Sequence, residues 1–159
     1  MRITAQPLTA EAFAPFGDVL APPTEPGRNY FEKGLTNGRP GAWPSLAITH
    51  TRPLTALPLQ ATMLERHPFS SQSFMPLDVA RWLIMVAPSG AQGGPDPSRA
   101  IAFAAGPGQG VTYHTGTWHH GLTALDRPAC FAVFMWRDGT STDEEFRQLA
   151  VPITVQVPG

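Results

Sequence analysis

The sequence predicts an all-β protein, a barrel or sandwich of short strands with two short helices. Three observations support this prediction: glycine and proline are frequent, apolar runs are short, and turn signals separate them. The 159 residues include 15 glycines and 18 prolines, which leaves little room for long helices. Hydrophobic residues make up 42% of the chain, so we expect one domain over residues 1–159 with a core of its own.

One short helix is expected near each end of the chain. Residues 9–16 form the first, with Thr9 as its N-cap. Thr142 to Glu145 matches the capping-box pattern, Ser or Thr followed three residues later by Glu. This pattern predicts a second helix that ends near Ala150.

Strands are expected along most of the remaining chain. Residues 81–87 are almost all apolar, which is typical of a strand buried on both faces. Residues 21–45 are rich in proline and glycine and are interpreted either as a plain loop or as a lid that supplies a cation. The expected strands are 46–51, 59–67, 72–77, 81–87, 100–105, 110–114, 129–136 and 151–157.

The charge and the apolar runs exclude several classes of partner. The formal net charge is -1, so no basic surface is expected to bind nucleic acid. The longest apolar run, residues 82–87, is far shorter than the about 20 residues of a membrane-spanning helix. The N-terminus lacks the apolar core of a signal peptide, and a single cysteine cannot form an internal disulfide. We therefore expect a soluble cytoplasmic protein with no membrane or nucleic-acid partner.

Two clusters of polar residues are candidates for a functional site. In the first, Glu65 and His67 lie on one face of an expected strand and Arg66 on the other, while Gln72 begins the next strand. Such carboxylate and imidazole groups serve both in acid–base chemistry near neutral pH and as ligands for a divalent metal.

The second cluster contains three of the five histidines. They are His114, His119 and His120, with Trp118 between them and Gly116 allowing a tight turn. His119 and His120 cannot both face one cavity if the backbone is extended there. His114 with one of that pair is therefore the expected inward set.

The spacing of both clusters resembles the two motifs of the cupin barrel family. Residues 65–67 occupy the place of the His-x-His element, and Gln72 follows at the place of the motif's glutamate. Gly108, residues 114–116 and His119 match the second motif, except that His114 stands where proline is usual. The resemblance implies a cupin-like double-stranded β-helix, the jelly-roll barrel.

Longer strings resemble the ureidoglycolate lyase family of allantoin and purine catabolism. They are residues 7–19, 64–68, 71–76 and 110–120. The resemblance implies a homodimeric enzyme that converts ureidoglycolate to glyoxylate and urea. Two alternatives stay open: a hydrolase that releases ammonia instead of urea, and a non-catalytic cupin that binds a small ligand.

The departures from the cupin pattern bear on the metal. Two of the four usual ligand positions carry Glu65 and Gln72 instead. A set of Glu65, His67, Gln72 and His119 would hold nickel, zinc or manganese, and catalysis without a metal stays open as well. No organic cofactor is expected.

The reaction defines the roles that the candidates would fill. A base takes the hydroxyl proton, an acid protonates the leaving nitrogen, and a cation, either a metal or an arginine, holds the carboxylate. His114 is the first choice for proton transfer because it is an added histidine at a turn. The expected catalytic residues are His67, Gln72, His114 and His119, and the expected substrate contacts are Glu65, Arg66, Trp118 and His120.

Overall fold

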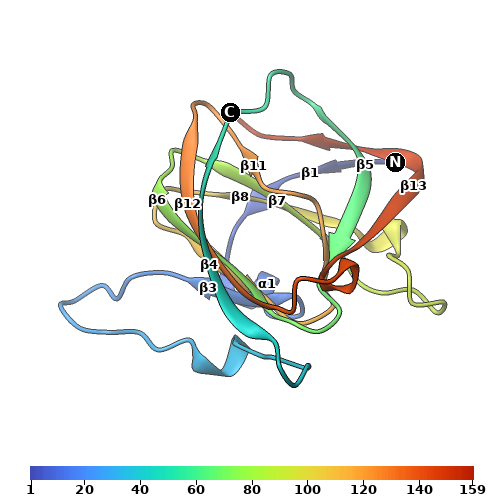
Figure 1. Cartoon of the computed structure of the whole chain (residues 1–159). Helices are drawn as coiled ribbons and strands as arrows, with labels where there is room; N and C mark the ends of the chain where they lie inside the picture. Colours follow the sequence, from blue (N-terminus) through green and yellow to red (C-terminus); the bar gives the residue numbers. More distant parts are fainter.

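Two β-sheets face one another around a shared interior in the computed structural model, which describes residues 1–159 (Figure 1). The larger sheet has eight strands. Seven run in the order β1 (Arg2–Thr4), β13 (Glu145–Gln156), β5 (Leu59–Arg66), β10 (Trp118–His119), β7 (Trp82–Ala87), β8 (Ile101–Ala105) and β2 (Gln6–Pro7), and β11 (Thr123–Ala124) pairs with β7. The structure confirms the prediction of an all-β barrel of short strands.

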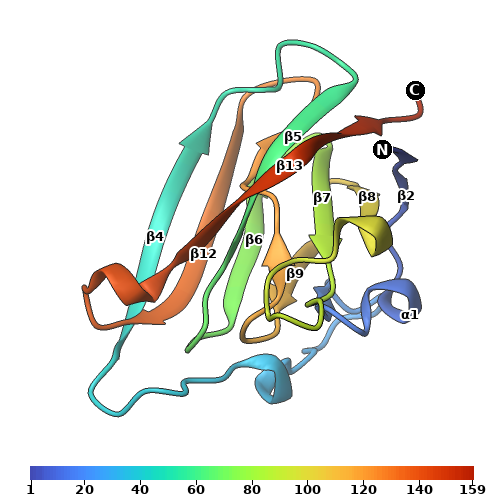
Figure 2. The same cartoon turned by 90° about the vertical axis from the view of Figure 1, so that its right-hand side faces the viewer.

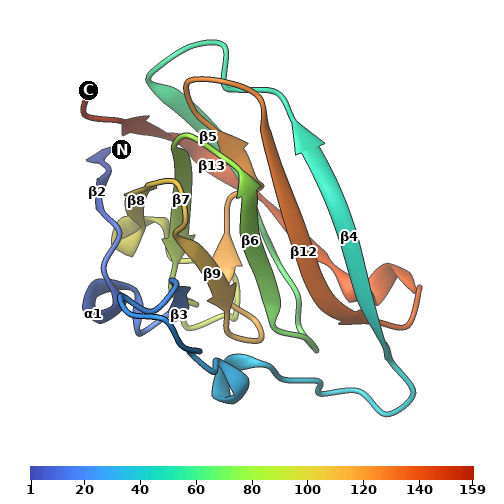
Figure 3. The same cartoon turned by 90° about the vertical axis from the view of Figure 1, so that its left-hand side faces the viewer.

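The smaller sheet has five strands, and Figures 2 and 3 show it from its two sides. Their order is β3 (Gly17–Leu20), β9 (Gly110–Tyr113), β6 (Gln72–Asp78), β12 (Ala129–Arg137) and β4 (Trp43–Thr51). β4 is an edge strand, paired with β12 alone over its whole length. The inner faces of β4, β6 and β12 look across the interior toward β5.

The alternation of side chains along β7 divides the core in two. Trp82, Ile84 and Val86 pack into the barrel interior with aromatic residues of the other sheet, whereas Leu83 and Met85 pack on the opposite face. Both faces of β7 are buried, as the unbroken apolar run predicts. Full burial of such a side chain stabilises the fold by roughly 1.5–3 kcal/mol.

The first predicted helix is present but short. α1 covers Ala10–Phe13, and the Thr9 hydroxyl caps it by accepting from the Ala12 N–H at 3.2 Å. No helix in the structure is long and apolar enough to cross a bilayer. Three single 3₁₀ turns complete the helical elements: η1 (Glu32–Gly34), η2 (Pro97–Arg99) and η3 (Ser141–Asp143).

The second predicted helix is wrong. The chain makes only the turn η3 and then enters β13, where Glu145 pairs with Arg66 of β5. The capping threonine is Thr140, whose hydroxyl accepts from the Thr142 N–H at 3.4 Å. Pairing with the free edge of β5 satisfies backbone groups that a short helix would leave open, and Pro152 forbids a longer helix.

The predicted strands are present, with boundaries shifted by a few residues. The expected last strand, 151–157, is the second half of the longer β13. Five strands of two to four residues were not predicted: β1, β2, β3, β10 and β11. Residues 21–42 are irregular apart from η1 and an isolated bridge at Asn37, in agreement with the sequence.

Candidate active site

A small cavity of about 170 Å³ opens between the edge of the five-stranded sheet and β5. Glu65, His67 and Gln72 of the first candidate cluster line it, and His119 of the second lies next to Glu65. Its walls come from β4, β5, β6, β12 and the turn before β13. The residues lining it are Ser45, Ala47, Thr49, Glu65, His67, Gln72, Val133, Met135, Arg137 and Glu144.

Three potential ligand atoms converge behind this cavity. Glu65 lies directly opposite His119 in the pairing of β5 with β10, and His67 follows two residues after Glu65. One carboxylate oxygen and one nitrogen of each imidazole lie within 4.8 Å of one another. The His119 Nε2 is 3.3 Å from Glu65 Oε1.

The hydrogen bonds of the two imidazoles fix their tautomers. The Nδ1 of His67 lies 3.0 Å from the Asp143 carbonyl oxygen, and the Nδ1 of His119 lies 2.9 Å from that of Thr117. A carbonyl oxygen only accepts, so both Nδ1 atoms must carry the hydrogen. Both Nε2 atoms are buried without a hydrogen-bond partner.

The unprotonated Nε2 atoms of His67 and His119 and the Glu65 carboxylate converge, and these electron-rich groups are stabilised by a positive charge between them. A proton shared with Glu65 satisfies this requirement, and so does a divalent cation. One carboxylate and two neutral imidazoles with fixed outer hydrogen bonds suit zinc, nickel or manganese. Glu65, His67 and His119 therefore fit a metal ion.

The turn before β10 positions both histidines. Gly116 has φ = 79°, a conformation that side-chain-bearing residues rarely adopt. Its N–H donates to the His67 carbonyl oxygen at 2.9 Å, and the next residue, Thr117, supplies the carbonyl that holds His119. The His119 ring also stacks on Tyr113, with 4.1 Å between ring centroids, so it has little freedom to rotate.

The electrostatics favour a charged carboxylate and a neutral His67. Burial alone raises the pKa of Glu65, but the interaction of its carboxylate with the nearby His119 and His67 outweighs it, so that pKa falls below its usual range. Burial and the nearby His119 lower the pKa of His67. His67 therefore enters a neutral-pH reaction as a base.

Gln72 and Arg137 complete the polar wall of the cavity. The Gln72 amide is buried, its Nε2 donates weakly to the Met135 sulfur at 3.8 Å, and its Oε1 has no partner. Arg137 was not among the predicted site residues. It lies at the end of β12 in phase with Val133 and Met135, which line the same cavity, and this alternation was the available signal.

Three other predicted contacts lie around the cluster, outside this cavity. Arg66 points away from it, stacks on Trp118 at 4.5 Å and pairs with Glu145 at 2.6 Å. Trp118 is fully buried. His120 is half-buried and lines a separate space of about 290 Å³, on whose wall Glu65 also lies, and burial lowers its pKa.

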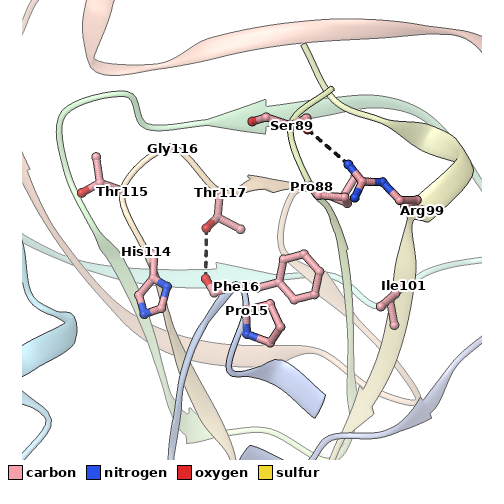
Figure 4. A pocket seen from close by; sticks show the side chains of 11 residues that line it. Pro15, Phe16, Pro88, Ser89, Arg99, Ile101, His114, Thr115, Gly116 and Thr117 are labelled. Carbon is pink, nitrogen blue, oxygen red and sulfur yellow. Dashed lines mark hydrogen bonds between the residues drawn. The ribbon is translucent and has the colours of Figure 1, made fainter. Parts of the chain in front are cut away.

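His114 is not brought to the cluster. Its side chain is exposed and lines a larger cavity, about 490 Å³, together with Pro15, Phe16 and Arg99 (Figure 4). This larger space lacks the convergent acid and imidazoles, so we place the candidate chemistry in the smaller one. The proton-transfer role of His114 stays a prediction.

Known proteins resemble the chain over nearly its full length. The family model described as "Ureidoglycolate lyase" matches residues 1–157. The ureidoglycolate lyase of Mesorhizobium japonicum is 38% identical over 158 residues, covering 91% of this chain and 92% of the relative. That of Schizosaccharomyces pombe is 33% identical, covering 90% of this chain and 88% of the relative.

A solved structure is also similar, at a looser level. It is Bacillus subtilis oxalate decarboxylase, described with Mn(II) centers, which is 16% identical with a TM-score of 0.43. The match covers 91% of this chain but only 30% of that one. A likeness of this degree does not define a site.

Proposed function

Because the chain belongs to the ureidoglycolate lyase family, we propose that its cavity beside Glu65, His67 and His119 cleaves ureidoglycolate. The enzyme is then a carbon–nitrogen lyase that releases glyoxylate and urea. The single observation that carries the proposal is the convergence of a carboxylate and two tautomer-fixed imidazoles on one small cavity.

The reaction is an elimination at one carbon. That carbon bears a carboxylate, a hydroxyl and a ureido nitrogen. A base removes the hydroxyl proton, the oxygen's electrons form the carbonyl of glyoxylate, and the carbon–nitrogen bond breaks. The nitrogen takes up a proton and leaves as urea. Each positioned proton transfer contributes about 10²–10⁴-fold to the rate.

His67 suits the role of base. Its lowered pKa keeps it neutral, and its Nε2 lone pair has no protein partner. The Asp143 carbonyl oxygen accepts the hydrogen on Nδ1 and stabilises the imidazolium that forms when the base takes its proton.

The pair of Glu65 and His119 suits the role of acid. In the protonated state of this pair, a proton in addition to the hydrogen on His119 Nδ1 lies between the His119 Nε2 and Glu65 Oε1, 3.3 Å apart, and is available to the leaving nitrogen. Gln72 accepts a hydrogen from the ureido group through its free Oε1, and this contact fixes the orientation of the leaving group.

Arg137 suits the substrate carboxylate. It is the arginine that lines the cavity, and its side chain is 44% exposed. The contact with Asp143 is long, 3.5 Å from Nε to the carboxylate, which leaves the guanidinium donors available. A carboxylate matches their fork geometry.

A divalent metal would be held by Glu65, His67 and His119, with Gln72 as a weaker neutral neighbour. When bound, such an ion supplies Lewis acidity toward the oxygen atoms of the substrate. Arg137 and Gln72 then orient the substrate by contacting its carboxylate and its ureido group.

The oligomer and the compartment are part of the same proposal. A second copy of the chain would cover the outer face of β4 and β12, where Leu46 and Ile48 are each 67% exposed. Apolar side chains gathered on one sheet face are typical of protein interfaces. We place the resulting homodimer, built of one domain per chain, in the cytoplasm.

A product assay tests the proposed function. Purified protein is mixed with fresh ureidoglycolate with and without a chelator, against a protein-free blank for spontaneous decay. We expect urea and glyoxylate in equal amounts above the blank. Ammonia without urea, or no rate above the blank in either arm, would overturn the proposal. Loss of rate with chelator and its return with added metal would assign the cluster to a metal ion.

A further inference from the structure

We infer that Arg39 is a positioning residue for His67, acting through Asp143 from a loop that does not line the cavity. The inference deepens the proposed function, because it treats His67 as a working group of that site. Arg39 belongs to the irregular segment between β3 and β4, and 104 residues separate it from Asp143.

The Asp143 carboxylate is the centre of this arrangement. Its side chain is only 1% exposed, and it forms an ion pair with Arg39, whose side chain is 18% exposed. It also accepts from the backbone N–H groups of Asp138 at 3.1 Å and Gly139 at 2.9 Å. The carboxylate thereby ties together both ends of the turn between β12 and β13.

This buried carboxylate depends mainly on Arg39, because its other arginine neighbour, Arg137, lies farther away, at 3.5 Å from Nε to the carboxylate. Burial of an unpaired charge is strongly unfavourable, and removal of one partner of a buried pair is far more damaging than loss of a surface pair. Arg39 also pairs with Asp138 at 2.6 Å and donates to Thr142 Oγ1 at 2.8 Å. One guanidinium therefore holds three residues of a turn that has no regular structure beyond η3.

The backbone carbonyl of Asp143 links the position of this turn to the orientation of the His67 ring. Its carbonyl oxygen accepts the hydrogen of Nδ1 at 3.0 Å, which leaves Nε2 bare toward Glu65 and His119. If the turn moves, nothing selects between the two neutral tautomers of His67. The tautomer with hydrogen on Nε2 offers neither a base nor a ligand atom to the cluster.

The positioning role of Arg39 must be distinguished from a purely structural one, because its guanidinium also stacks on Phe69 at 4.6 Å. Arg39→Ala removes the charge and the stacking together, whereas Arg39→Lys keeps the charge without the fork. Arg81→Ala is the matched control, since it breaks an exposed arginine–aspartate pair with Asp126 that has no contact with the site.

The test reads the tautomer and the kinetics separately. Long-range ¹H–¹⁵N NMR of the imidazoles, with the His67 signals assigned from a His67→Gln spectrum, shows which nitrogen carries the hydrogen. We expect Nδ1–H in the wild type and in Arg81→Ala, and a mixture of tautomers in Arg39→Ala. We also expect kcat to fall by about 10–100-fold, the usual effect of losing such an outer partner, with an intermediate value for Arg39→Lys.

The outcomes separate the two proposals. A folded Arg39→Ala protein that keeps the Nδ1–H signal and the wild-type kcat overturns the positioning role. If Arg39→Ala does not fold, Arg39→Lys decides by the same two measurements. If the wild type does not cleave ureidoglycolate, the proposed function fails, while the NMR spectra still show whether Arg39 sets the tautomer of His67.

Discussion

Replacement of Arg137 by alanine tests how the site recognises its substrate. A hydrogen bond to a charged group contributes about 1.5–3 kcal/mol. Arg137 is 44% exposed, so solvent screening favours the lower part of that range. Since about 1.4 kcal/mol corresponds to tenfold, kcat/KM for ureidoglycolate should fall roughly 10- to 30-fold.

The assay compares two substrates. Glyoxylate release from ureidoglycolate and formaldehyde release from hydroxymethylurea follow the same elimination, but hydroxymethylurea lacks the carboxylate. Arg137→Ala should lower the first rate and leave the second unchanged. Asp143 keeps Arg39 as its partner in this variant, so His67 should stay in place.

Matched variants sharpen the interpretation. Arg147→Ala removes an equal charge from β13, where the side chain is 57% exposed and pairs with Glu145, and should leave both substrates unaffected. Arg137→Lys should fall between the wild type and Arg137→Ala because it loses the fork geometry. An equal loss on both substrates, or none on ureidoglycolate, would refute the assigned role in binding the carboxylate.

Three further predictions follow from other parts of the chain. His114→Asn tests the predicted proton-transfer role of a side chain that lines a cavity apart from His67; a loss of kcat/KM above about tenfold would support that role, and a value near the wild type would contradict it. Ile48→Asp should shift sedimentation from dimer to monomer, and an unchanged dimer would place the interface elsewhere. The hydrogen bond and charge of Arg81 lower the pKa of Asp126 from 3.8, so this pair stabilises the fold above that pH and loses its effect as pH falls. Asp126→Asn should therefore flatten the acid side of the curve of Tm against pH. A curve parallel to that of the wild type would contradict this.

The sequence predicted most strands because their signal is local. The alternation in residues 59–66 and the apolar run 82–87 determine which face each side chain takes. The short strand β10 carries no such signal, since two residues cannot display a period. It exists because the turn at Gly116 delivers His119 opposite Glu65.

The failed helix and the missed Arg39 have one cause. The pattern from Thr142 to Glu145 predicts a helix start only when no other element forms hydrogen bonds with this backbone. Here the edge of β5 pairs with it instead. Arg39 reaches Asp143 only after segments 104 residues apart meet, whereas Arg137 lies on β12 in phase with Val133 and Met135. Spacing motifs identified Glu65, His67 and His119 because two neighbouring strands bear them, and no motif records a partner that comes from a loop.

The sequence separation of His67 and Asp143 also determines how long the site stays incomplete while a new chain is synthesised. The two residues are 76 positions apart, and ribosomes add about 5–20 residues per second. His67 therefore emerges roughly 4–15 s before the carbonyl that fixes it. Throughout that interval β5 lacks β13, its long neighbour, and exposes an unpaired edge that invites pairing with other chains. Rapid completion of the C-terminal strand thus protects both the nascent chain and its site.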